Sequence, residues 1–370
     1  MKYTGKITDS HLHMHGGYTD TDGLYRGMER LGAEAGYTAK NVVMVPQWDA
    51  EFIGQNILGI LYKALYPGRL FCYAGFDYYK PSGLDGTDLE RQAREYAAMG
   101  FDGIKMVELK PTVYRNLGGV RLGGPRYDGM FSFLEESGMP VLLHMGDPET
   151  FWHRDRAPAF AVENGWLYGE GGYPELEALY ADVENMLRRH PGLKVSLAHF
   201  FFLSDDIERA ERVMAEYPGA CLDITPGTEM YGSFSQIPEK WRDFFIAHSG
   251  RILFGTDNGW GSMTPMEEKI AFARENVGVM RRFLETGDSF EGYGMALRGL
   301  DLPVTALENI YWKNFERIAG KTPKPVAMDR AAAYASRMAE LYRGTGVPFY
   351  ARVFPQIEAM SERLAALAAI

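Results

Sequence analysis

The stretch at residues 7–17, ITDSHLHMHGG, runs from an apolar residue through alternating histidines to a pair of glycines. We interpret it as a short β-strand that ends in a glycine turn. Successive side chains of a strand point to opposite faces, so Asp9, His11 and His13 share one face. Two imidazoles at the end of one strand can bind one metal ion. Two polar residues at a turn explain the pair equally well, so the rest of the chain decides between the two interpretations.

Seven further apolar runs follow, and segments with helical spacing separate them. Runs rich in Val, Ile, Leu and Phe predict strands buried on both faces, as in a parallel sheet covered by helices. Eight is also the number of strands that closes a (β/α)8 TIM barrel. A doubly wound open sheet is the main alternative, but no glycine-rich phosphate loop follows an early strand. Besides the first strand, we predict strands at 40–46, 69–76, 102–107, 140–145, 194–200, 220–225 and 251–256, and helices at 20–36, in the fifties and sixties, and at 88–99, 127–137 and 174–189.

Two segments are additional to a plain barrel. Residues 146–173 form a long connection rich in Gly, Trp and Tyr, which indicates an ordered lid or pocket wall. Prolines at 323 and 325 mark a break, and two amphipathic helices are expected near 330–342 and 355–367. We therefore predict a barrel domain over 1–320 and a C-terminal helical extension over 321–370, which packs on the barrel or on a partner subunit.

Composition excludes several classes of function. The chain has 370 residues, 46% of them hydrophobic, which suits a globular protein with a sizeable core. A formal net charge of −10 and the absence of basic runs disfavour nucleic acid as a partner. Cys72 and Cys221 lie far apart in apolar runs, which predicts buried thiols and a reducing compartment. With no signal peptide and no apolar run of membrane-spanning length, we expect a cytoplasmic protein without a membrane partner.

Metal-compatible side chains follow three more predicted strands. His144 lies near the end of the fifth strand, His199 near the end of the sixth, and Asp257 directly after the eighth. In a barrel of this kind, functional residues collect at the C-terminal ends of strands. An aspartate there can instead cap a helix, but Asn258 and Gly259 come next, so no helix starts at once. The complete set, with the first-strand pair, is far more specific than any member.

The other histidines are sorted by the same rule. His190 and His248 precede strands, at the opposite rim, and we expect surface or helix-end roles. His15 lies in the glycine turn, and we expect no ligand role for it. His153 lies in the long connection, where it is a candidate substrate contact or an ordinary loop residue.

Aromatic residues are frequent on the predicted loops. Trp152, Trp166 and Tyr168 belong to the long connection, and Trp260 follows the eighth strand. Such side chains would suit the wall of a pocket for an aromatic or planar substrate, although loop aromatics serve packing equally often.

These stretches resemble the amidohydrolase superfamily, most closely its second amidohydrolase branch, which contains hydrolases, hydratases and aromatic-acid decarboxylases. The resemblance covers roughly residues 6–320. It implies a (β/α)8 barrel in which His11, His13, His144 and Asp257 surround one divalent ion, with His199 as a catalytic group beside it. The matching segments are DSHLH at 9–13, GIK at 103–105, PVLLH at 140–144, LAH at 197–199, FGTD at 254–257 and NIYWKNF at 309–315.

Lys105 leaves two alternatives open. It ends the fourth predicted strand, where binuclear members of the superfamily carry a carboxylated lysine that bridges two metal ions. In that case His144 and His199 would both bind a second ion. In a mononuclear site, which is usual in this branch, Lys105 would instead pair with a substrate carboxylate or lie beside Glu108.

The resemblance predicts an enzyme with a small-molecule substrate. We expect zinc as the ion, with manganese as the alternative, and hydrolysis of an amide, ester, lactone or C–C bond by activated water. Asp257 and His199 would move protons and polarise the scissile group, and Lys105, Trp152, His153 and Trp260 would contact substrate. Non-oxidative decarboxylation of an aromatic or enol acid is the first alternative, and a non-catalytic barrel that binds a small acid is the second. A homo-oligomer is compatible with the sequence.

Overall fold

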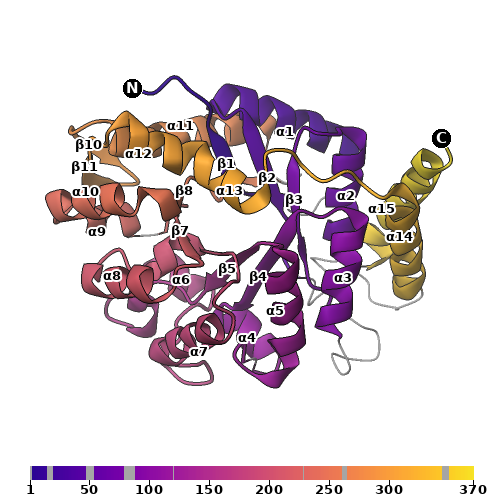
Figure 1. Cartoon of the computed structure of the whole chain (residues 1–370), viewed down its shortest axis with the longest axis horizontal. Coiled ribbons are helices and arrows are strands. Elements are labelled where there is room, and N and C mark those ends of the chain that lie inside the picture. The colour runs from indigo at the N-terminus through magenta and orange to yellow at the C-terminus, as the bar shows by residue number, and fades with distance from the viewer. Residues whose placement is uncertain are drawn as a thin grey trace. The chain divides into compact units, whose positions relative to one another are not determined.

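The computed structural model of the protein describes residues 2–14, 20–46, 54–78, 88–119, 121–227, 229–260, 265–343 and 350–370. Eight parallel strands alternate with helices along these residues, which confirms the predicted α/β class and the TIM-barrel-like fold (Figure 1). Contacts within the chain define two units. Unit 1 comprises residues 1–5, 106–254 and 278–314, and unit 2 comprises residues 6–105, 255–277 and 315–370.

Unit 2 carries the first strands of the sheet and the segment after the eighth. Its strands are hydrogen-bonded in the order β9–β1–β2–β3–β4, and the pairs are parallel. The strands are β1 (Thr8–Met14), β2 (Ala39–Val43), β3 (Phe71–Gly75), β9 (Gly259–Trp260) and the first part of β4 (Gly103–Leu109). The helices are α1 (Thr21–Ala35), α2 (Gln55–Leu65), α3 (Leu89–Met99), the first part of α11 (Met266–Glu285), α13 (Asn314–Ala319), α14 (Met328–Tyr342) and α15 (Tyr350–Ala368).

Helix ends in unit 2 follow local chemistry that is visible in the sequence. The Asp20 side chain accepts a hydrogen bond from the Gly23 amide at 2.7 Å, which caps the start of α1. Gly36 ends the same helix with φ at 88°, a left-handed conformation that glycine adopts without steric cost. Asp88 and Gly100 bound α3 in the same way. The helices predicted at 20–36 and 88–99 are thereby confirmed.

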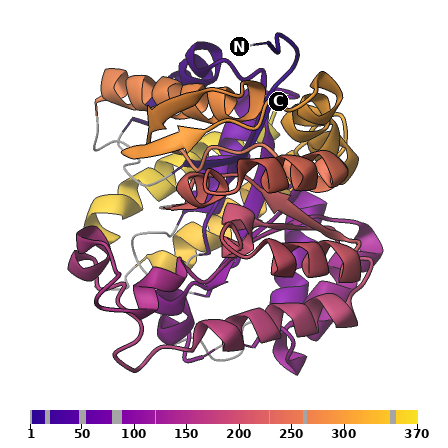
Figure 2. The same ribbon diagram turned by 90° about the vertical axis from the view of Figure 1, so that its left-hand side faces the viewer.

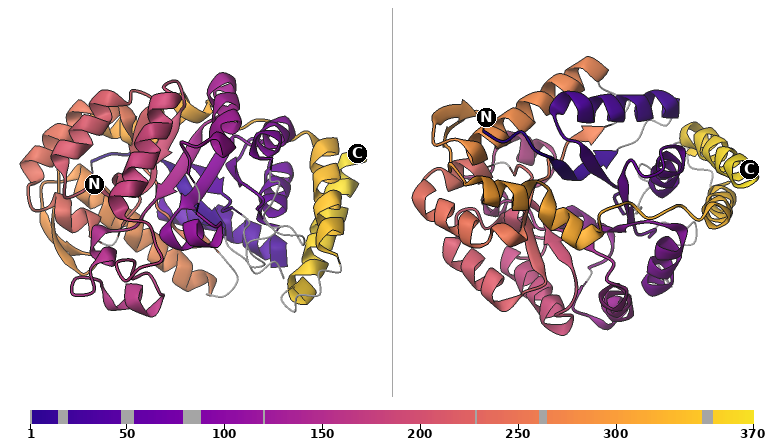
Figure 3. Two further views of the ribbon diagram at one scale, coloured as in Figure 1. Left: turned by 90° about the horizontal axis from the view of Figure 1, so that it is seen from below. Right: turned by 45° about the horizontal axis from the view of Figure 1, so that its top comes forward.

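The C-terminal helices α14 and α15 lie side by side and pack on helices of unit 2 (Figure 3). Both contact α2, and α14 also contacts α3. The Tyr342 hydroxyl lies 3.1 Å from both carboxylate oxygens of Asp77, and the Asn56 amide lies 3.3 Å from the Tyr334 hydroxyl. The two predicted tail helices are confirmed. A separate domain that begins at residue 321, and its contact with a partner subunit, stay predictions.

Unit 1 carries the second half of the sheet. From the last part of β4 the order continues β5–β6–β7–β8, with parallel pairs from β5 onward. A hairpin of β10 (Ser289–Gly292) and β11 (Met295–Arg298), drawn as orange arrows in Figure 2, lies outside the predicted set. The other strands are β5 (Val141–Met145), β6 (Val195–Leu197), β7 (Ala220–Asp223) and β8 (Ile252–Leu253). The helices are α4 (Pro111–Asn116), α5 (Pro125–Ser137), α6 (Ala159–Glu163), α7 (Leu176–Arg189), α8 (Ile207–Glu216), α9 (Met230–Phe234), α10 (Pro238–Ala247) and α12 (Val304–Glu308).

Strand β6 ends earlier than the sequence predicts. It stops at Leu197 rather than at residue 200, because the backbone enters a left-handed turn at His199. Four consecutive residues without a glycine, 199–202, have φ between 53° and 57°. This conformation costs about 1–2 kcal/mol per residue. The Phe200 ring, buried against Phe234, Trp241, Phe244 and Phe245 at centroid distances of 4.9–5.7 Å, supplies compensating contacts.

Burial agrees with the interpretation of the two thiols. The Cys72 and Cys221 thiols are both buried, as predicted. Of the helices that the structure describes, none has the length and apolar character that crossing a bilayer requires.

Candidate active site

Three side chains of unit 2 converge at the C-terminal end of β1. The Nε2 atoms of His11 and His13 lie 3.1 Å apart. The Asp257 Oδ1 atom lies 3.4 Å from His11 Nε2 and 3.1 Å from His13 Nε2. His11 and His13 are buried, whereas about a third of the Asp257 side chain is exposed. Two of the predicted strand ends therefore bring their metal-compatible side chains together.

This triangle of donor atoms fits a metal ion. Tetrahedral zinc with ligand bonds of about 2.0–2.1 Å separates its ligand atoms by about 3.3 Å. The three observed separations, 3.1, 3.1 and 3.4 Å, lie close to that value. Two imidazoles and one carboxylate also match the donor types of catalytic zinc sites, which use three protein ligands and leave one position open.

A buried hydrogen-bond network fixes the backbone around the triangle. The Asp9 carboxylate accepts hydrogen bonds from the His11 amide, the Thr256 amide and the Thr256 hydroxyl, at 3.1, 3.0 and 2.6 Å. Burial raises the pKa of Asp9 to about 7, against the lowering effect of these hydrogen bonds. The Asn276 amide donates to the Thr256 carbonyl oxygen at 3.1 Å and joins α11 to the network. The pairing of β1 with β2 shifts register between Asp9 and Leu12, so a strand face shared by Asp9 and the histidines stays a prediction, and Asp9 supports the loop that carries Asp257.

Asp257 does not cap a helix. Its backbone has φ at 53°, its amide donates to the His11 carbonyl oxygen at 2.8 Å, and β9 follows at Gly259. The strained backbone directs the carboxylate toward the histidine pair rather than along the following segment. The interpretation of Asp257 as a site residue is consistent with this geometry.

Lys105 lies at the same site. Its Nζ atom is 2.9 Å from His11 Nε2, and the side chain is fully buried in β4. An ammonium group at this position donates to the imidazole nitrogen that faces Asp257. A divalent ion bound to the same nitrogen would repel that ammonium group. The charged form of Lys105 and a bound ion therefore destabilise each other.

A second histidine pair lies in unit 1. The Nδ1 atom of His144, at the end of β5, is 3.1 Å from the Nε2 atom of His199. Burial lowers the pKa of His144 to about 4, which leaves the imidazole in the neutral form that binds metals. The His144 Nε2 atom lies 3.0 Å from the Gly146 carbonyl oxygen, which can only accept, so the neutral ring has its hydrogen on Nε2 and a lone pair on Nδ1. The separation of the two facing nitrogens suits two ligands of one ion. A ligand role for His144 in the β1 site stays a prediction.

The long connection after β5 forms a packed aromatic cluster. Trp152 is buried and donates its indole N–H to the Pro174 carbonyl oxygen at 3.0 Å, and its ring lies 4.8 Å from that of Tyr168. The Tyr168 hydroxyl donates to Asp147 at 2.5 Å, and Lys110 pairs with the same carboxylate at 2.7 Å. This confirms an ordered segment, and its contact with substrate stays a prediction.

Besides Lys105, the predicted substrate contacts outside this cluster are His153 and Trp260. His153 is half exposed and lies 2.5 Å from a Glu149 carboxylate oxygen. Trp260 contributes its backbone to β9, and its side chain lies outside the described part of the chain, as does His15. Their predicted roles stay predictions.

Three residues at and beyond the end of β7 were not anticipated from the sequence. Asp223, the last residue of β7, and Thr225, two residues further on, accept hydrogen bonds from the His199 amide. Glu229 lies just beyond them, and its Oε2 atom is buried with no hydrogen-bond partner among the described residues. Burial, with a smaller contribution from nearby carboxylates, raises the pKa of Glu229 to about 7. Their position after a parallel strand was the one available signal.

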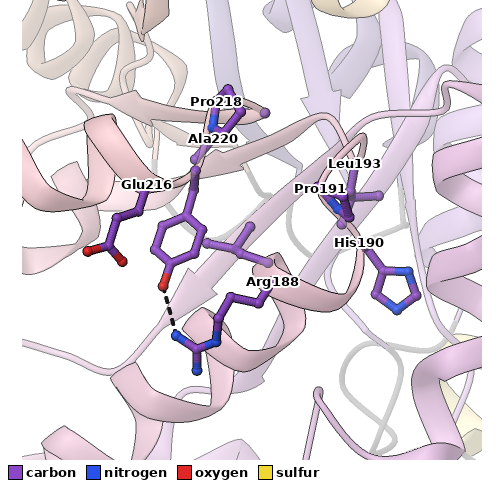
Figure 4. Close-up of a pocket in the computed structure, with 10 residues that line it drawn as sticks. Arg188, His190, Pro191, Leu193, Glu216, Pro218 and Ala220 are labelled. Atoms are coloured by element: carbon purple, nitrogen blue, oxygen red, sulfur yellow. Dashed lines mark hydrogen bonds between the residues drawn. The ribbon is translucent and has the colours of Figure 1, made fainter.

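Unit 1 has a small cavity near the beginning of β7, at the opposite end of that strand from Asp223. Figure 4 shows it between α7, α8 and the start of β7, with Arg188 donating to the Tyr217 hydroxyl at 3.0 Å. Its volume of about 190 Å³ is below the range of about 300–1,000 Å³ typical of ligand pockets. His190 and His248 end α7 and α10 and approach acidic side chains, which confirms their helix-end positions.

Comparison with known families agrees with the geometry. The profile of the family described as amidohydrolase matches residues 80–318, more than half of the chain. The chain therefore belongs to the amidohydrolase family. The matched stretch contains Lys105, His144, His199 and Asp257 and begins after the histidine pair of β1. No curated protein matches the chain.

Several solved structures are similar to this fold at low sequence identity. An amidohydrolase II is 15% identical, with a TM-score of 0.51, and the match covers 85% of this chain and all of that one. A dihydroxybenzoic acid decarboxylase from Polaromonas with bound manganese is 14% identical, covering 85% and 97% of the two chains, at a TM-score of 0.48. A probable 2-pyrone-4,6-dicarboxylic acid hydrolase from Acinetobacter baumannii is 12% identical, covering 85% and 100%, at 0.47.

Proposed function

We propose that the protein is a metal-dependent hydrolase that acts on an amide, ester, lactone or C–C bond of a small aromatic or carboxylated substrate. The observation that carries the proposal is the convergence of His11 Nε2, His13 Nε2 and Asp257 Oδ1 at 3.1–3.4 Å. Family membership supports an enzymatic role. Zinc is the proposed ion because the donor set and its spacing suit tetrahedral coordination, and manganese is the alternative.

A bound divalent ion supplies Lewis acidity and lowers the pKa of water toward neutrality. In the proposed reaction the His11 and His13 imidazoles hold the ion, and Asp257 accepts the proton of the attacking water. The exposed part of the Asp257 carboxylate can pass that proton to the leaving group or to solvent. His199 polarises the scissile group, and His144 is the proposed further ligand.

A two-metal site is a second candidate, and one observation favours it. Lys105 Nζ lies 2.9 Å from His11 Nε2, where an ammonium group and a divalent ion would repel each other. Carboxylation of Lys105 would replace that repulsion with an anionic ligand. The facing nitrogens of His144 and His199, 3.1 Å apart, would then hold the second ion.

The test is turnover of a panel of small aromatic and carboxylated amides, esters and lactones by zinc- and manganese-loaded protein. Hydrolysis that disappears on chelation and in Asp257→Asn supports the proposal. Release of CO2 without uptake of water would assign a decarboxylase instead. Metal-loaded protein that turns over no member of the panel, yet melts at a higher temperature with a small acid, would indicate a binding protein.

A further inference from the structure

The end of β7 surrounds the backbone of His199 with hydrogen bonds. The Asp223 Oδ1 atom accepts from the His199 amide at 2.8 Å, from the Thr225 amide at 3.2 Å and from the Thr225 hydroxyl at 2.5 Å. Asp223 and Thr225 are fully buried. A carboxylate so placed is compensated by the donors around it, and it fixes the direction of the Thr225 hydroxyl hydrogen.

That direction decides where the proton of the His199 ring lies. His199 Nδ1 is 3.3 Å from the Thr225 carbonyl oxygen and 3.2 Å from the Thr225 hydroxyl oxygen. The carbonyl oxygen can only accept, and the hydroxyl hydrogen points to Asp223, so both neighbours act as acceptors. The neutral imidazole therefore carries its hydrogen on Nδ1 and presents a lone pair at Nε2, which faces His144.

The backbone of His199 also depends on this contact. His199 begins the left-handed turn of residues 199–202, a conformation that residues other than glycine rarely adopt. Phe200 is packed among aromatic rings, and the Asp223 carboxylate accepts a hydrogen bond from the His199 amide. Both the orientation of the ring and its tautomer are therefore set from β7.

We propose that Asp223 and Thr225 are positioning residues that hold His199 as the Nδ1–H tautomer, so that Nε2 presents its lone pair on the side of His144. The proposal rests on the proposed role of His199 for its consequence in catalysis. Its structural content concerns the chain itself and is testable without turnover. Loss of Asp223 releases the Thr225 hydroxyl to donate to His199 Nδ1, which favours the opposite tautomer.

The experiment is a two-bond ¹⁵N–¹H spectrum of full-length protein with labelled histidine, as purified and after chelation. The His199→Gln spectrum identifies the His199 signals. We expect the Nδ1–H pattern in the wild type, the Nε2–H pattern in Asp223→Ala, and return of Nδ1–H in Asp223→Ala/Thr225→Val, which lacks the competing hydroxyl. Thr225→Ser, which keeps the hydroxyl, and Ser137→Ala, which removes a hydroxyl at the end of α5, should match the wild type.

An Nε2–H pattern in the wild type overturns the proposal even where Asp223→Ala fails to fold. An unchanged tautomer in a folded Asp223→Ala overturns it as well. On substrate, we expect kcat/KM to fall by about 10–100-fold in Asp223→Ala and to recover in part in the double variant. Protein that lacks metal and turnover but shows the expected tautomers would contradict the proposed function alone.

Discussion

Replacement of His13 by alanine removes one corner of the donor triangle and leaves its surroundings in place. His13 Nε2 lies 3.1 Å from both His11 Nε2 and Asp257 Oδ1, so no other described donor completes the same triangle. The variant keeps two of the three convergent donors, and any contribution of the proposed ligand His144 is common to both proteins. We therefore expect the ion to bind much more weakly, while the barrel folds.

The size of the effect follows from linkage between binding and folding. Free ion at 1,000 times its dissociation constant stabilises the folded state by about 4 kcal/mol. An unfolding entropy of about 2.1 cal/mol/K per residue gives a chain of this length about 0.8 kcal/mol/K. Addition of metal should accordingly raise the Tm of the wild type by about 5 °C, and that of His13→Ala by about 1 °C or less.

The assay compares the Tm and metal content of the metal-free and the metal-reloaded form of each protein. Because both forms carry the same substitution, the effect on Tm of any cavity that it leaves cancels. His248→Ala is the matched control, because it removes an imidazole that ends α10 and pairs with Glu211. It should keep the full metal-dependent rise. A full rise and full metal content in His13→Ala would refute the assignment of His13 as a ligand.

Three further predictions follow from the same geometry. Asp257→Asn should lower kcat by about 10²–10⁴-fold with metal largely retained, by kinetics beside metal analysis; near-normal kcat would exclude a proton-transfer role. Lys105 should be unmodified in a mononuclear site, and a carbamate in the intact mass together with two metal ions per chain would establish the binuclear alternative. Burial raises the pKa of Glu229 to about 7, so the folded state binds its proton more tightly and loses stability as pH rises from about 4.5 to 7. At pH 8 the free energy of unfolding of Glu229→Gln should therefore exceed that of the wild type by at most about 3 kcal/mol, and at pH 4 the two should be similar. Urea titrations measure both, and equal midpoints at both pH values would contradict this.

Much of the fold could be predicted because local chemistry and tertiary structure agree. Asp20 and Gly36 bound α1 by capping rules that need no knowledge of the rest of the chain. The strands are buried apolar runs, so their order and number were visible. The site residues of unit 2 could be predicted because strand alternation and the C-terminal rim rule place His11, His13 and Asp257 together.

Other features depend on contacts between distant residues and left no local pattern. The left-handed turn at His199 shortens β6, and it persists because Phe200 and Asp223 hold it from other elements. Thr225 ends the strand predicted at 220–225 and Glu229 follows it in a loop. Only the burial of Thr225 and of the Glu229 Oε2 atom distinguishes them. The β10–β11 hairpin carries too few apolar positions to be separated from loop.

The central claim is that His11, His13 and Asp257 hold a catalytic metal ion. An anomalous-difference map from crystals of the zinc-loaded protein, recorded on either side of the zinc absorption edge, tests it most directly. We expect a peak about 2.0–2.2 Å from His11 Nε2, His13 Nε2 and an Asp257 carboxylate oxygen. A map with no peak at these three atoms, or with its strongest peak bound elsewhere in the chain, would contradict it.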